Sequence, residues 1–258
     1  MRILLASMEL QSLTGQPTYT KFLAKGLKEL GHEVRLVGLE NGLRAVSGHY
    51  DIALIAENIP EYLKYFTADK IFNICHSKDE ADEPILDTRI TKFLAPRQDV
   101  INHWQKEYED CELEFDILPN PMDFSKWEVK REKQDKYIIL SASSICSLRR
   151  PMFIDLISRA NKDTEVWIVG KNHGGLDGIE IPNNVKIFPE TDNLVEYMKK
   201  ADEVAGIFVG RVTLEAQIMG IKTSVYDEKG NWEYVEPNNL EKHNYKKVAE
   251  QLCKMTEN

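Results

Sequence analysis

The stretch Gly206-Ile-Phe-Val-Gly-Arg-Val-Thr-Leu-Glu-Ala-Gln-Ile-Met-Gly220 carries the strongest fold signal in this chain, and the apolar run Ile221–Tyr226 follows it directly. The pattern predicts a tight turn at Gly210, a helix that carries Glu215 about one turn in, a stop at Gly220, and then a buried strand. A loop that enters a helix and returns to a strand is a unit of a parallel α/β sheet.

The first turn of this helix has the chemistry of a diphosphate site. Backbone N–H groups at a helix N-terminus lack partners within the helix, and the macrodipole adds about +0.5 charge there, so an anion can be held without a metal. Arg211 adds a forked, permanently charged donor. Glu215 can accept hydrogen bonds from two ribose hydroxyls, but an Arg and a Glu four residues apart also form an ordinary helix-surface ion pair. Both interpretations stay open at this point.

Length and composition limit the class of protein. The 258 residues suffice for two domains of ordinary size, and 42% hydrophobic with 29% charged residues is typical of a soluble globular protein. The apolar run Met1–Ala6 is too short for a signal peptide, and no stretch approaches the roughly 20 apolar residues of a membrane span. We therefore expect a cytoplasmic protein without stable membrane insertion.

Metal and disulfide frameworks are not indicated. The four cysteines lie far apart without a Cys-x-x-Cys spacing. Four of the histidines show no metal-ligand spacing either, namely His32, His49, His103 and His173. We expect no metal site.

The charge is acidic and unevenly spread. The net charge is −9, with 13 Lys and Arg against 20 Asp and Glu in residues 1–118, and 20 against 22 in residues 119–258. Sequence-independent attraction to nucleic acid or to anionic lipid needs clustered cations, so an acidic first half argues against both. A local basic groove remains compatible with these counts.

Short apolar runs alternate with amphipathic helical stretches, which indicates βαβ units and parallel sheets. Pro119–Trp127 interrupts this alternation with two prolines, and the charged segment Glu128–Lys136 has no apolar stripe. We predict a domain 1–118 and a domain 119–258. The predicted strands are Arg2–Ala6, Glu33–Gly38, Asp51–Ala56, Lys70–Cys75, Thr91–Ala95, Phe115–Leu118, Tyr137–Ala142, Glu165–Gly170, Val185–Phe188 and Val204–Val209; the predicted helices are Pro17–Leu30, Pro60–Phe66, Gln98–Glu107, Pro151–Ala160 and Asn193–Ala201.

Five segments together resemble one enzyme family. They are Thr14-Gly-Gln-Pro continuing to Val34, Ile117-Leu-Pro-Asn-Pro-Met-Asp123, Ser147-Leu-Arg-Arg-Pro151, Val166-Trp-Ile-Val-Gly170 and Gly210-Arg-Val-Thr-Leu-Glu-Ala216. Their order and spacing resemble those of GT-B nucleotide-sugar glycosyltransferases of the retaining, GT4-like type. The resemblance implies two Rossmann-like domains whose parallel sheets face a central cleft, with the acceptor on the first domain and the donor on the second.

The resemblance also implies roles for individual residues. Gly15 would approach the donor phosphates, Arg149 would replace a phosphate-binding lysine, and Arg211 and Val212 would offer backbone N–H groups to the diphosphate. Glu215 would bind the ribose, and His76 would contact the sugar and the reacting centre. The complete expected donor site is Gly15, Ser144, Arg149, Gly170, Lys171, Phe188, Gly210, Arg211, Val212 and Glu215, with His76, Arg149 and Glu215 as the catalytic set.

The reaction implied by the resemblance moves a sugar from a nucleoside diphosphate, UDP first among the candidates, to an acceptor hydroxyl. It would proceed with retention and without a metal or other cofactor. The acceptor is unknown and could be a glycan, a small molecule or a modified DNA base. Glu9 and Asp79 are candidate acceptor contacts.

Two departures from the family pattern leave other functions open. Ile207 stands where the family has a second glutamate that holds the transferred sugar, and Ser144 stands where it has a phosphate-site arginine. The short C-terminal end also leaves little room for the family's long helix back to the first domain. The alternatives are a compact viral-type glycosyltransferase acting on modified DNA bases and a catalytically silent nucleotide-sugar-binding protein. A dinucleotide oxidoreductase is a weaker alternative because no Gly-x-Gly-x-x-Gly follows the first strand.

Several site residues also have structural interpretations. His76 could be a strand-end histidine bonded to backbone, and Arg149 and Arg150 could be solvated surface charges. Lys171 lies in a polar glycine-rich loop that needs no ligand. By the resemblance, Phe188 sits where the family positions the nucleotide base, but taken alone the residue fits a core position better than a base platform.

Overall fold

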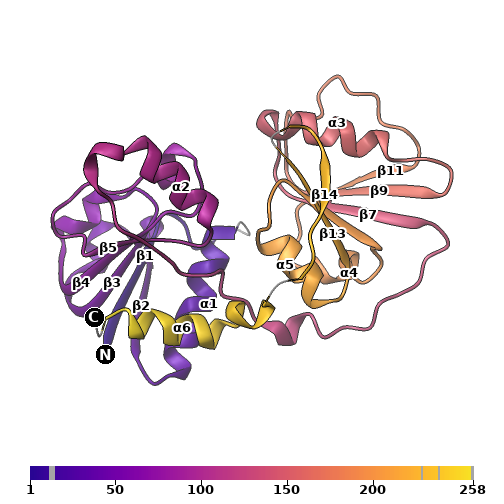
Figure 1. Ribbon diagram of the computed structural model, residues 1–258. Helices are drawn as coiled ribbons and strands as arrows, with labels where there is room; N and C mark the ends of the chain where they lie inside the picture. Colours follow the sequence, from indigo (N-terminus) through magenta and orange to yellow (C-terminus); the bar gives the residue numbers. More distant parts are fainter. Residues whose placement is uncertain (12–14, 228, 238, 257–258) are drawn as a thin grey trace. The chain divides into compact units, whose positions relative to one another are not determined.

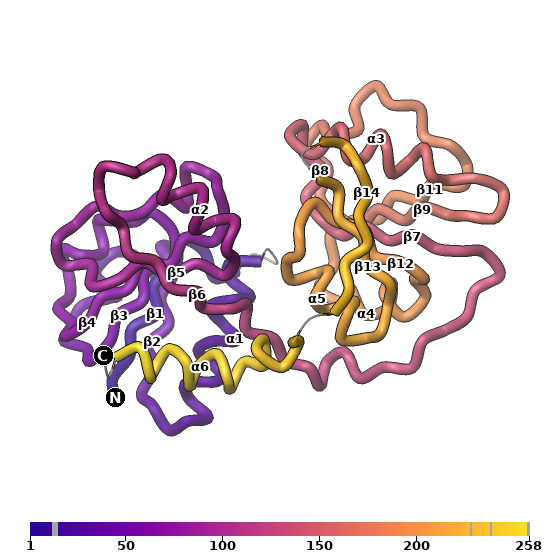
Figure 2. Tube along the Cα trace, in the orientation of Figure 1, coloured from indigo at the N-terminus to yellow at the C-terminus, as the bar shows by residue number. Residues whose placement is uncertain are grey.

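The computed structural model describes residues 1–11, 15–227, 229–237 and 239–256 (Figures 1 and 2). The chain divides into two compact units. Unit 1 comprises Met1–Met122 and Glu241–Asn258, and unit 2 comprises Asp123–Leu240. Each unit contains its own six-stranded sheet, which confirms the predicted α/β class.

Unit 1 is built on an all-parallel sheet in the order β2-β1-β3-β4-β5-β6. The chain runs through β1 (Arg2–Ser7), α1 (Gly15–Glu29), β2 (Glu33–Gly38), β3 (Gly48–Ala56), β4 (Phe66–Ile74), β5 (Lys92–Ala95), α2 (Gln98–Glu107) and β6 (Phe115–Ile117). Apolar side chains on both faces of the central strands are fully buried, as expected for a parallel sheet covered on both sides.

The C-terminal helix α6 (Tyr245–Lys254) packs beside α1 on one face of this sheet (Figure 1). Gly26 of α1 allows the close approach, because a Cβ there would meet the Tyr245 carbonyl oxygen and the Ala249 side chain. The Tyr245 hydroxyl also donates to the Glu29 carboxylate at 2.9 Å.

The position of α6 corrects the sequence-based boundary. The prediction assigned residues 119–258 to the second domain and left little chain for a returning helix, whereas Glu241–Asn258 belongs to unit 1. The reason is burial, since Val248, Ala249 and Leu252 lie in the same core as α1 and the strands of unit 1. Their i, i+1, i+4 spacing is an apolar stripe that the sequence analysis did not use.

Unit 2 has the strand order β11-β9-β7-β12-β13-β14, parallel except for β14. Its elements are β7 (Tyr137–Ala142), β8 (Ile145–Cys146), α3 (Arg150–Ser158), β9 (Thr164–Val169), β10 (Asn172–His173), β11 (Val185–Phe188), α4 (Val195–Met198), β12 (Glu203–Gly206), α5 (Arg211–Ile218), β13 (Lys222–Tyr226) and β14 (Trp232–Tyr234). Helix α3 covers one sheet face, and α4 and α5 cover the other.

The strand order of unit 2 determines where a ligand can bind. Numbered within the unit, the strands follow the order 3-2-1-4-5-6 of the doubly wound nucleotide-binding fold, and the order reverses between β7 and β12. In such sheets the ligand crevice lies outside the carboxyl ends of the strands at this switch point. The loops after β7 and β12 are therefore the candidate binding loops of unit 2.

Most predicted elements are confirmed, and the differences have local causes. Strands 33–38, 137–142 and 185–188 and helix 98–107 match residue for residue. The predicted helix Pro60–Phe66 is a 3-10 segment over Pro60–Lys64, because β4 already begins at Phe66. The predicted helix Asn193–Ala201 is shorter, at Val195–Met198. The short strands β8, β10 and β14 and helix α6 were not predicted.

None of the helices in the described part of the chain is both long and apolar enough to cross a membrane.

Candidate functional site

The carboxyl edge of the unit 2 sheet contains most of the predicted donor residues. Strands β7 and β12 pair in parallel, with Glu203 opposite Ile139 and Val204 opposite Leu140. The segments that leave these two strands therefore start next to each other at the same edge. One leads to Ser144 and Arg149, and the other leads to Gly210 and Arg211.

Gly210 forms the cap of α5 through a reciprocal pair of hydrogen bonds. Its N–H donates to Thr213 Oγ1 at 2.9 Å, and the Thr213 hydroxyl donates back to the Gly210 carbonyl at 2.9 Å. A Cβ at position 210 would overlap the Phe208 ring. The predicted tight turn is confirmed, and a side chain at position 210 would have to displace the Phe208 ring. Gly220 ends the segment at a φ of +68°, as expected for a helix stop.

Glu215 lies one turn into α5 and is 3% exposed. The Arg211 Nε lies 3.4 Å from Glu215 Oε1, so the ordinary i, i+4 ion pair is present. Glu215 Oε2 is also buried and has no hydrogen-bond partner among the described residues. A buried oxygen without a partner costs about 1–3 kcal/mol, which a hydroxyl donor from a ligand would offset. The ion pair therefore does not use the whole carboxylate, although protein atoms cover the second oxygen in this structure.

Burial raises the pKa of the Glu215 carboxyl to about 7, although the charges of Arg211 and Lys126 act in the opposite direction. A carboxyl that titrates near neutral pH can accept two hydroxyl hydrogen bonds only in its ionised form. Ligand donors at this position would therefore compete with a proton.

Arg149 and Arg150 have different environments. Within the described residues, the Arg149 guanidinium donates a single long hydrogen bond, from Nη1 to the Ser144 carbonyl at 3.3 Å. Arg150 Nη1 donates to the carbonyls of Gly175 and Asp177 at 3.3 and 2.9 Å, and thus anchors the loop after β10. Of the two arginines, Arg149 is the one whose guanidinium the protein engages least, as expected of a residue that binds a ligand.

Gly170 brings the ends of β7 and β9 into close contact. A Cβ on Gly170 would overlap the Ser143 carbonyl oxygen. The Ser143 N–H donates to the Val169 carbonyl at 3.0 Å, and the Ile145 N–H donates to the Lys171 carbonyl at 2.9 Å. These contacts hold the exposed Lys171 beside the loop that carries Ser144 and Arg149.

Phe188 lies at the end of the edge strand β11 and is partly buried. Its ring packs edge-on against Trp167 and Tyr197, with centroids 5.5 and 4.9 Å apart. It is thus part of an aromatic group at the sheet edge, separated by β9 and β7 from the strand that leads into α5.

Ile207 does not form part of the polar site. Its side chain is partly buried and packs against the core that α3 covers. It contributes neither charge nor a hydrogen-bonding group at the position where the family pattern has a glutamate.

Two of the predicted residues belong to unit 1. Gly15 is exposed at the start of α1, after residues 12–14, which lie outside the described part of the chain. His76 follows β4, is 8% exposed, and packs edge-on against the Tyr19 ring at 4.7 Å. Burial, with a smaller contribution from Arg97, lowers the pKa of His76 to about 3, and His76 Nε2 has no hydrogen-bond partner among the described residues. It is a neutral imidazole with an unused ring nitrogen.

Two buried carboxyl groups of unit 1, those of Asp82 and Glu57, were not predicted from the sequence. Asp82, 1% exposed, accepts hydrogen bonds from Gln16 Nε2 at 2.9 Å, from the Ser77 hydroxyl and from the His76 backbone N–H. Glu57 follows β3 at a φ of +76° and accepts hydrogen bonds from the Ser7 hydroxyl and the Met8 N–H. Burial raises the pKa of both carboxyls, that of Glu57 to about 7.

Glu57 had a usable sequence signal, since it directly follows the buried run Ile52–Ala56. The proposed acceptor contacts Glu9 and Asp79 are both exposed. The Asp79 backbone N–H donates to the Ser77 hydroxyl oxygen at 3.1 Å. Among the residues that the structure describes, no group of three or more His, Cys, Asp or Glu side chains is placed to hold a metal ion.

Comparison with known proteins identifies the fold. No protein-family model matches the chain, and no curated protein matches its sequence. Solved structures do match. HepE of Anabaena in complex with UDP-glucose has a TM-score of 0.60 at 12% identity, over 86% of this chain and 79% of that one. Sucrose-phosphate synthase of Thermosynechococcus elongatus has a TM-score of 0.63 at 10% identity, over 86% and 80%. The T4 phage β-glucosyltransferase has a TM-score of 0.57 at 14% identity, over 89% and 81%.

These matches span both units and show that the chain has the GT-B fold, as the sequence resemblance predicted. At 10–14% identity the likeness extends to the fold and no further.

Proposed function

We propose that this protein is a glycosyltransferase that moves a sugar from a nucleoside diphosphate to an acceptor hydroxyl. One observation carries the proposal: at the switch point of unit 2, the buried Glu215 combines an ion pair to Arg211 with an oxygen that has no hydrogen-bond partner in the described part of the chain. The arginine can bind a phosphate, and the carboxylate oxygen that lacks a hydrogen bond can accept one from a hydroxyl. A nucleotide carries a phosphate and the vicinal hydroxyls of its ribose.

The proposed donor contacts follow from the strand ends. Arg149 and the start of α5 at Gly210–Val212 would bind the diphosphate, and Glu215 would accept hydrogen bonds from the ribose hydroxyls. Ser144, Gly170 and Lys171 would complete the wall of the site. These donors would stabilise the negative charge that develops on the leaving diphosphate, an effect usually worth several kcal/mol. UDP is the first nucleotide to test, since HepE is known in complexes with UDP and with UDP-glucose.

The finer chemistry of the proposal follows the family resemblance. The acceptor hydroxyl would attack on the side from which the diphosphate leaves, so the product would keep the anomeric configuration of the donor. The cations of the site would take the place of a metal ion. His76, neutral and with a free ring nitrogen, would contact the transferred sugar. Product analysis by NMR tests retention, and activity in EDTA tests independence from metal.

A second candidate is the compact viral-type glycosyltransferase acting on modified DNA bases. The match to a phage β-glucosyltransferase favours it, whereas the excess of acidic over basic residues in 1–118 disfavours a nucleic-acid acceptor. The silent nucleotide-sugar-binding protein is the third, and Ile207 and Ser144 are the residues that favour it. Salt-dependent DNA binding would support the viral-type glycosyltransferase. Nucleotide binding without donor turnover would support the silent binding protein.

The test is thermal unfolding of the protein with UDP, GDP, ADP, TDP, CDP and their common sugar conjugates. A ligand at 100 times its Kd adds about 2.7 kcal/mol to the stability of the native state. We expect a rise in Tm with one base, UDP first. No rise with any of these ligands would contradict the donor site.

The matched control is the variant Glu215→Ala. It should abolish most of the nucleotide-induced rise in Tm while leaving the circular dichroism spectrum unchanged. Glu57→Gln, which alters a buried carboxyl of unit 1, should keep the full rise. Equal responses of the wild type and Glu215→Ala would remove Glu215 from the ribose role.

A further inference from the structure

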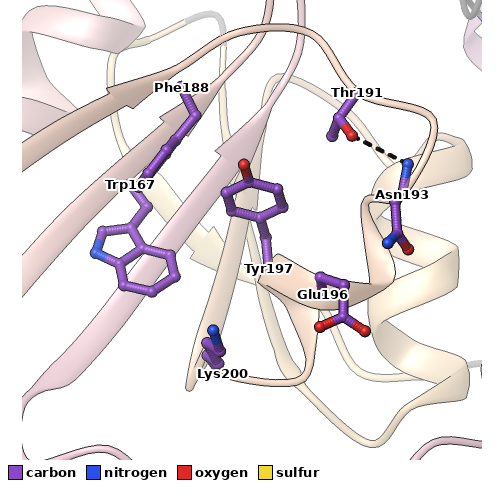
Figure 3. A pocket seen from close by; sticks show the side chains of 7 residues that line it. All are labelled: Trp167, Phe188, Thr191, Asn193, Glu196, Tyr197 and Lys200. Atoms are coloured by element: carbon purple, nitrogen blue, oxygen red, sulfur yellow. Dashed lines mark hydrogen bonds between the residues drawn. The ribbon is translucent and has the colours of Figure 1, made fainter.

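A second concave site lies in unit 2, at the edge of the sheet opposite β14. It is a cavity of about 420 Å³ between the carboxyl half of β9 and β11 and the short helix α4 (Figure 3). This volume lies within the usual range of small-molecule pockets, about 300–1,000 Å³. The lining residues are Trp167, Phe188, Thr191, Asn193, Glu196, Tyr197 and Lys200. We call it the aromatic pocket.

The aromatic pocket is separate from the proposed nucleotide site. Strands β9 and β7 lie between β11 and β12, and β12 leads into α5. Three interstrand spacings of about 4.8 Å place β11 about 14 Å from β12. Apart from Phe188, none of the lining residues belongs to the predicted donor site.

The walls of the pocket combine rings and hydrogen-bonding groups. Figure 3 shows Trp167 and Phe188 on the strands at one side, Asn193 and Glu196 at the other, and Tyr197 between them. The Tyr197 hydroxyl, the Asn193 side-chain amide and the Lys200 ammonium have no hydrogen-bond partner among the described residues. Because α4 has only four residues, it leaves these groups partly uncovered.

The arrangement of the rings favours a non-planar ligand. Trp167 and Phe188 meet at 63°, Phe188 and Tyr197 at 63°, and Trp167 and Tyr197 at 85°. A planar nucleobase stacks best in a slot between near-parallel faces, and none of these pairs forms such a slot. Rings that meet at steep angles instead form a concave surface. The C–H face of a pyranose chair can lie on such rings, since the negative face of an aromatic ring attracts the weakly positive C–H groups.

The charges also argue against a phosphate ligand. The lining contains one ammonium, Lys200, and one carboxylate, Glu196, which already pairs with Lys199 at 2.6 Å. A phosphate site usually gathers arginines or backbone N–H groups, and such a cluster does not line this pocket. Asn193, Thr191, Tyr197 and Glu196 instead supply mixed donors and acceptors, which match the hydroxyls of an uncharged sugar.

We propose that the aromatic pocket is a carbohydrate-binding site that accommodates one or two uncharged pyranose units. It is independent of the nucleotide site, so it would operate whether or not the chain transfers a sugar. In a glycosyltransferase it would hold a sugar residue of a longer glycan at a distance from the reacting centre.

The test is saturation-transfer difference NMR of the full chain with methyl glucoside, methyl galactoside, methyl mannoside, N-acetylglucosamine and maltose, in the absence of nucleotide. We expect saturation of C–H protons on one face of at least one of these sugars, with a Kd in the millimolar range. Asn193→Ala should weaken this binding at least fivefold, and Tyr197→Ala should remove it. Asn193 makes no side-chain hydrogen bond in the described structure, so its variant should fold even if Tyr197→Ala does not.

Two variants serve as controls. Tyr234→Ala removes another exposed tyrosine of unit 2 and should bind the sugar as the wild type does. Glu215→Ala should lose nucleotide binding and keep sugar binding, so the two proposals can fail separately.

The proposal would be overturned if none of these sugars gave a signal at about 50 mM, a concentration well above a millimolar Kd. A sugar signal that is unchanged in both Asn193→Ala and Tyr197→Ala would also overturn it. The same holds if uridine binds this pocket more tightly than any of the sugars.

Discussion

The carboxyl edges of the two sheets differ in charge although both units have the same layered α/β construction. At the switch point of unit 2 the strand ends carry Arg149 and Arg211. In unit 1 the order reverses between β1 and β3, and the carboxyl group of Glu57 lies there, bonded to Ser7 and Met8 at the end of β1. The switch point of unit 2 thus carries two guanidinium groups, whereas that of unit 1 carries a buried carboxyl group.

Within the proposed function, we expect this difference to separate the two substrates. A diphosphate would be repelled by the carboxyl groups of unit 1 and attracted by the arginines of unit 2. An uncharged hydroxyl acceptor tolerates the carboxyl groups and can hydrogen-bond to them. The predictions below test this contrast, from the largest expected effect to the smallest.

Two glycines of the expected donor site, Gly15 and Gly170, should respond very differently to alanine. Gly170→Ala would force a Cβ into the Ser143 carbonyl, so we expect it to lower the free energy of unfolding by about 3 kcal/mol or more. At Gly15 a Cβ would have no heavy atom within 4 Å, and Gly15→Ala should change stability by less than about 0.5 kcal/mol. Urea denaturation measures both. Similar losses for the two variants would contradict the packing difference.

The buried carboxyl of unit 1 should reduce stability at high pH. Because the pKa of Glu57 is raised from 4.5 to about 7, its contribution to stability is full below pH 4.5 and is lost as the pH rises through 7. Glu57→Gln removes this titration, so the variant should match the wild type at pH 4 and exceed it by about 2 kcal/mol at pH 8. Chemical denaturation across pH 4–8 measures the difference. A variant less stable than the wild type at pH 8 would show that the charge of Glu57 is required by the fold.

The buried carboxyl of unit 2 should instead appear in the pH dependence of ligand binding. The ionised form of Glu215 accepts two hydroxyls, and its pKa is about 7, so affinity for UDP-glucose should rise about tenfold from pH 6 to pH 8. Calorimetry at several pH values tests this. Glu215→Gln should bind weakly and lose the pH dependence, whereas Glu57→Gln should retain it. A wild-type affinity that is flat across this range would contradict the ribose role.

The two neighbouring arginines should separate binding from stability. Arg149→Gln should weaken nucleotide binding about fivefold and leave stability unchanged, since Arg149 makes one long hydrogen bond. Arg150→Gln should lower stability by about 1 kcal/mol, because it loses bonds to two carbonyls, and leave nucleotide affinity unchanged. Calorimetry and denaturation on the same two variants measure both quantities. If Arg150→Gln weakened nucleotide binding and Arg149→Gln lowered stability instead, the phosphate contact would be assigned to Arg150.

The strands and the cap of α5 were predictable because their signals are local. Gly220 ends α5 through its own positive φ, and buried strands appear as uninterrupted apolar runs. Helix α6 was missed because its neighbour α1 lies more than 200 residues away in the chain, and only burial against α1 shows which unit it joins.

The candidate site likewise has features that the sequence predicted and features that only the tertiary structure shows. The sequence indicated Arg149, Arg211 and Glu215 through their spacing, but whether Glu215 was a surface ion pair or an open carboxylate depended on burial. The aromatic pocket was not predicted at all, since Trp167, Phe188 and Tyr197 converge only when β9, β11 and α4 pack together.

By itself, the sequence determined the α/β class, the GT-B resemblance, most element boundaries and the acidic first half, since each depends on residue type and short-range order. Only the tertiary structure decided which unit holds α6, that one Glu215 oxygen is buried without a hydrogen bond to any described residue, and that the carboxyl group of Glu57 lies at the unit 1 switch point. Desolvation and hydrogen-bond partners depend on side chains brought together from distant parts of the chain, so no local pattern contains them.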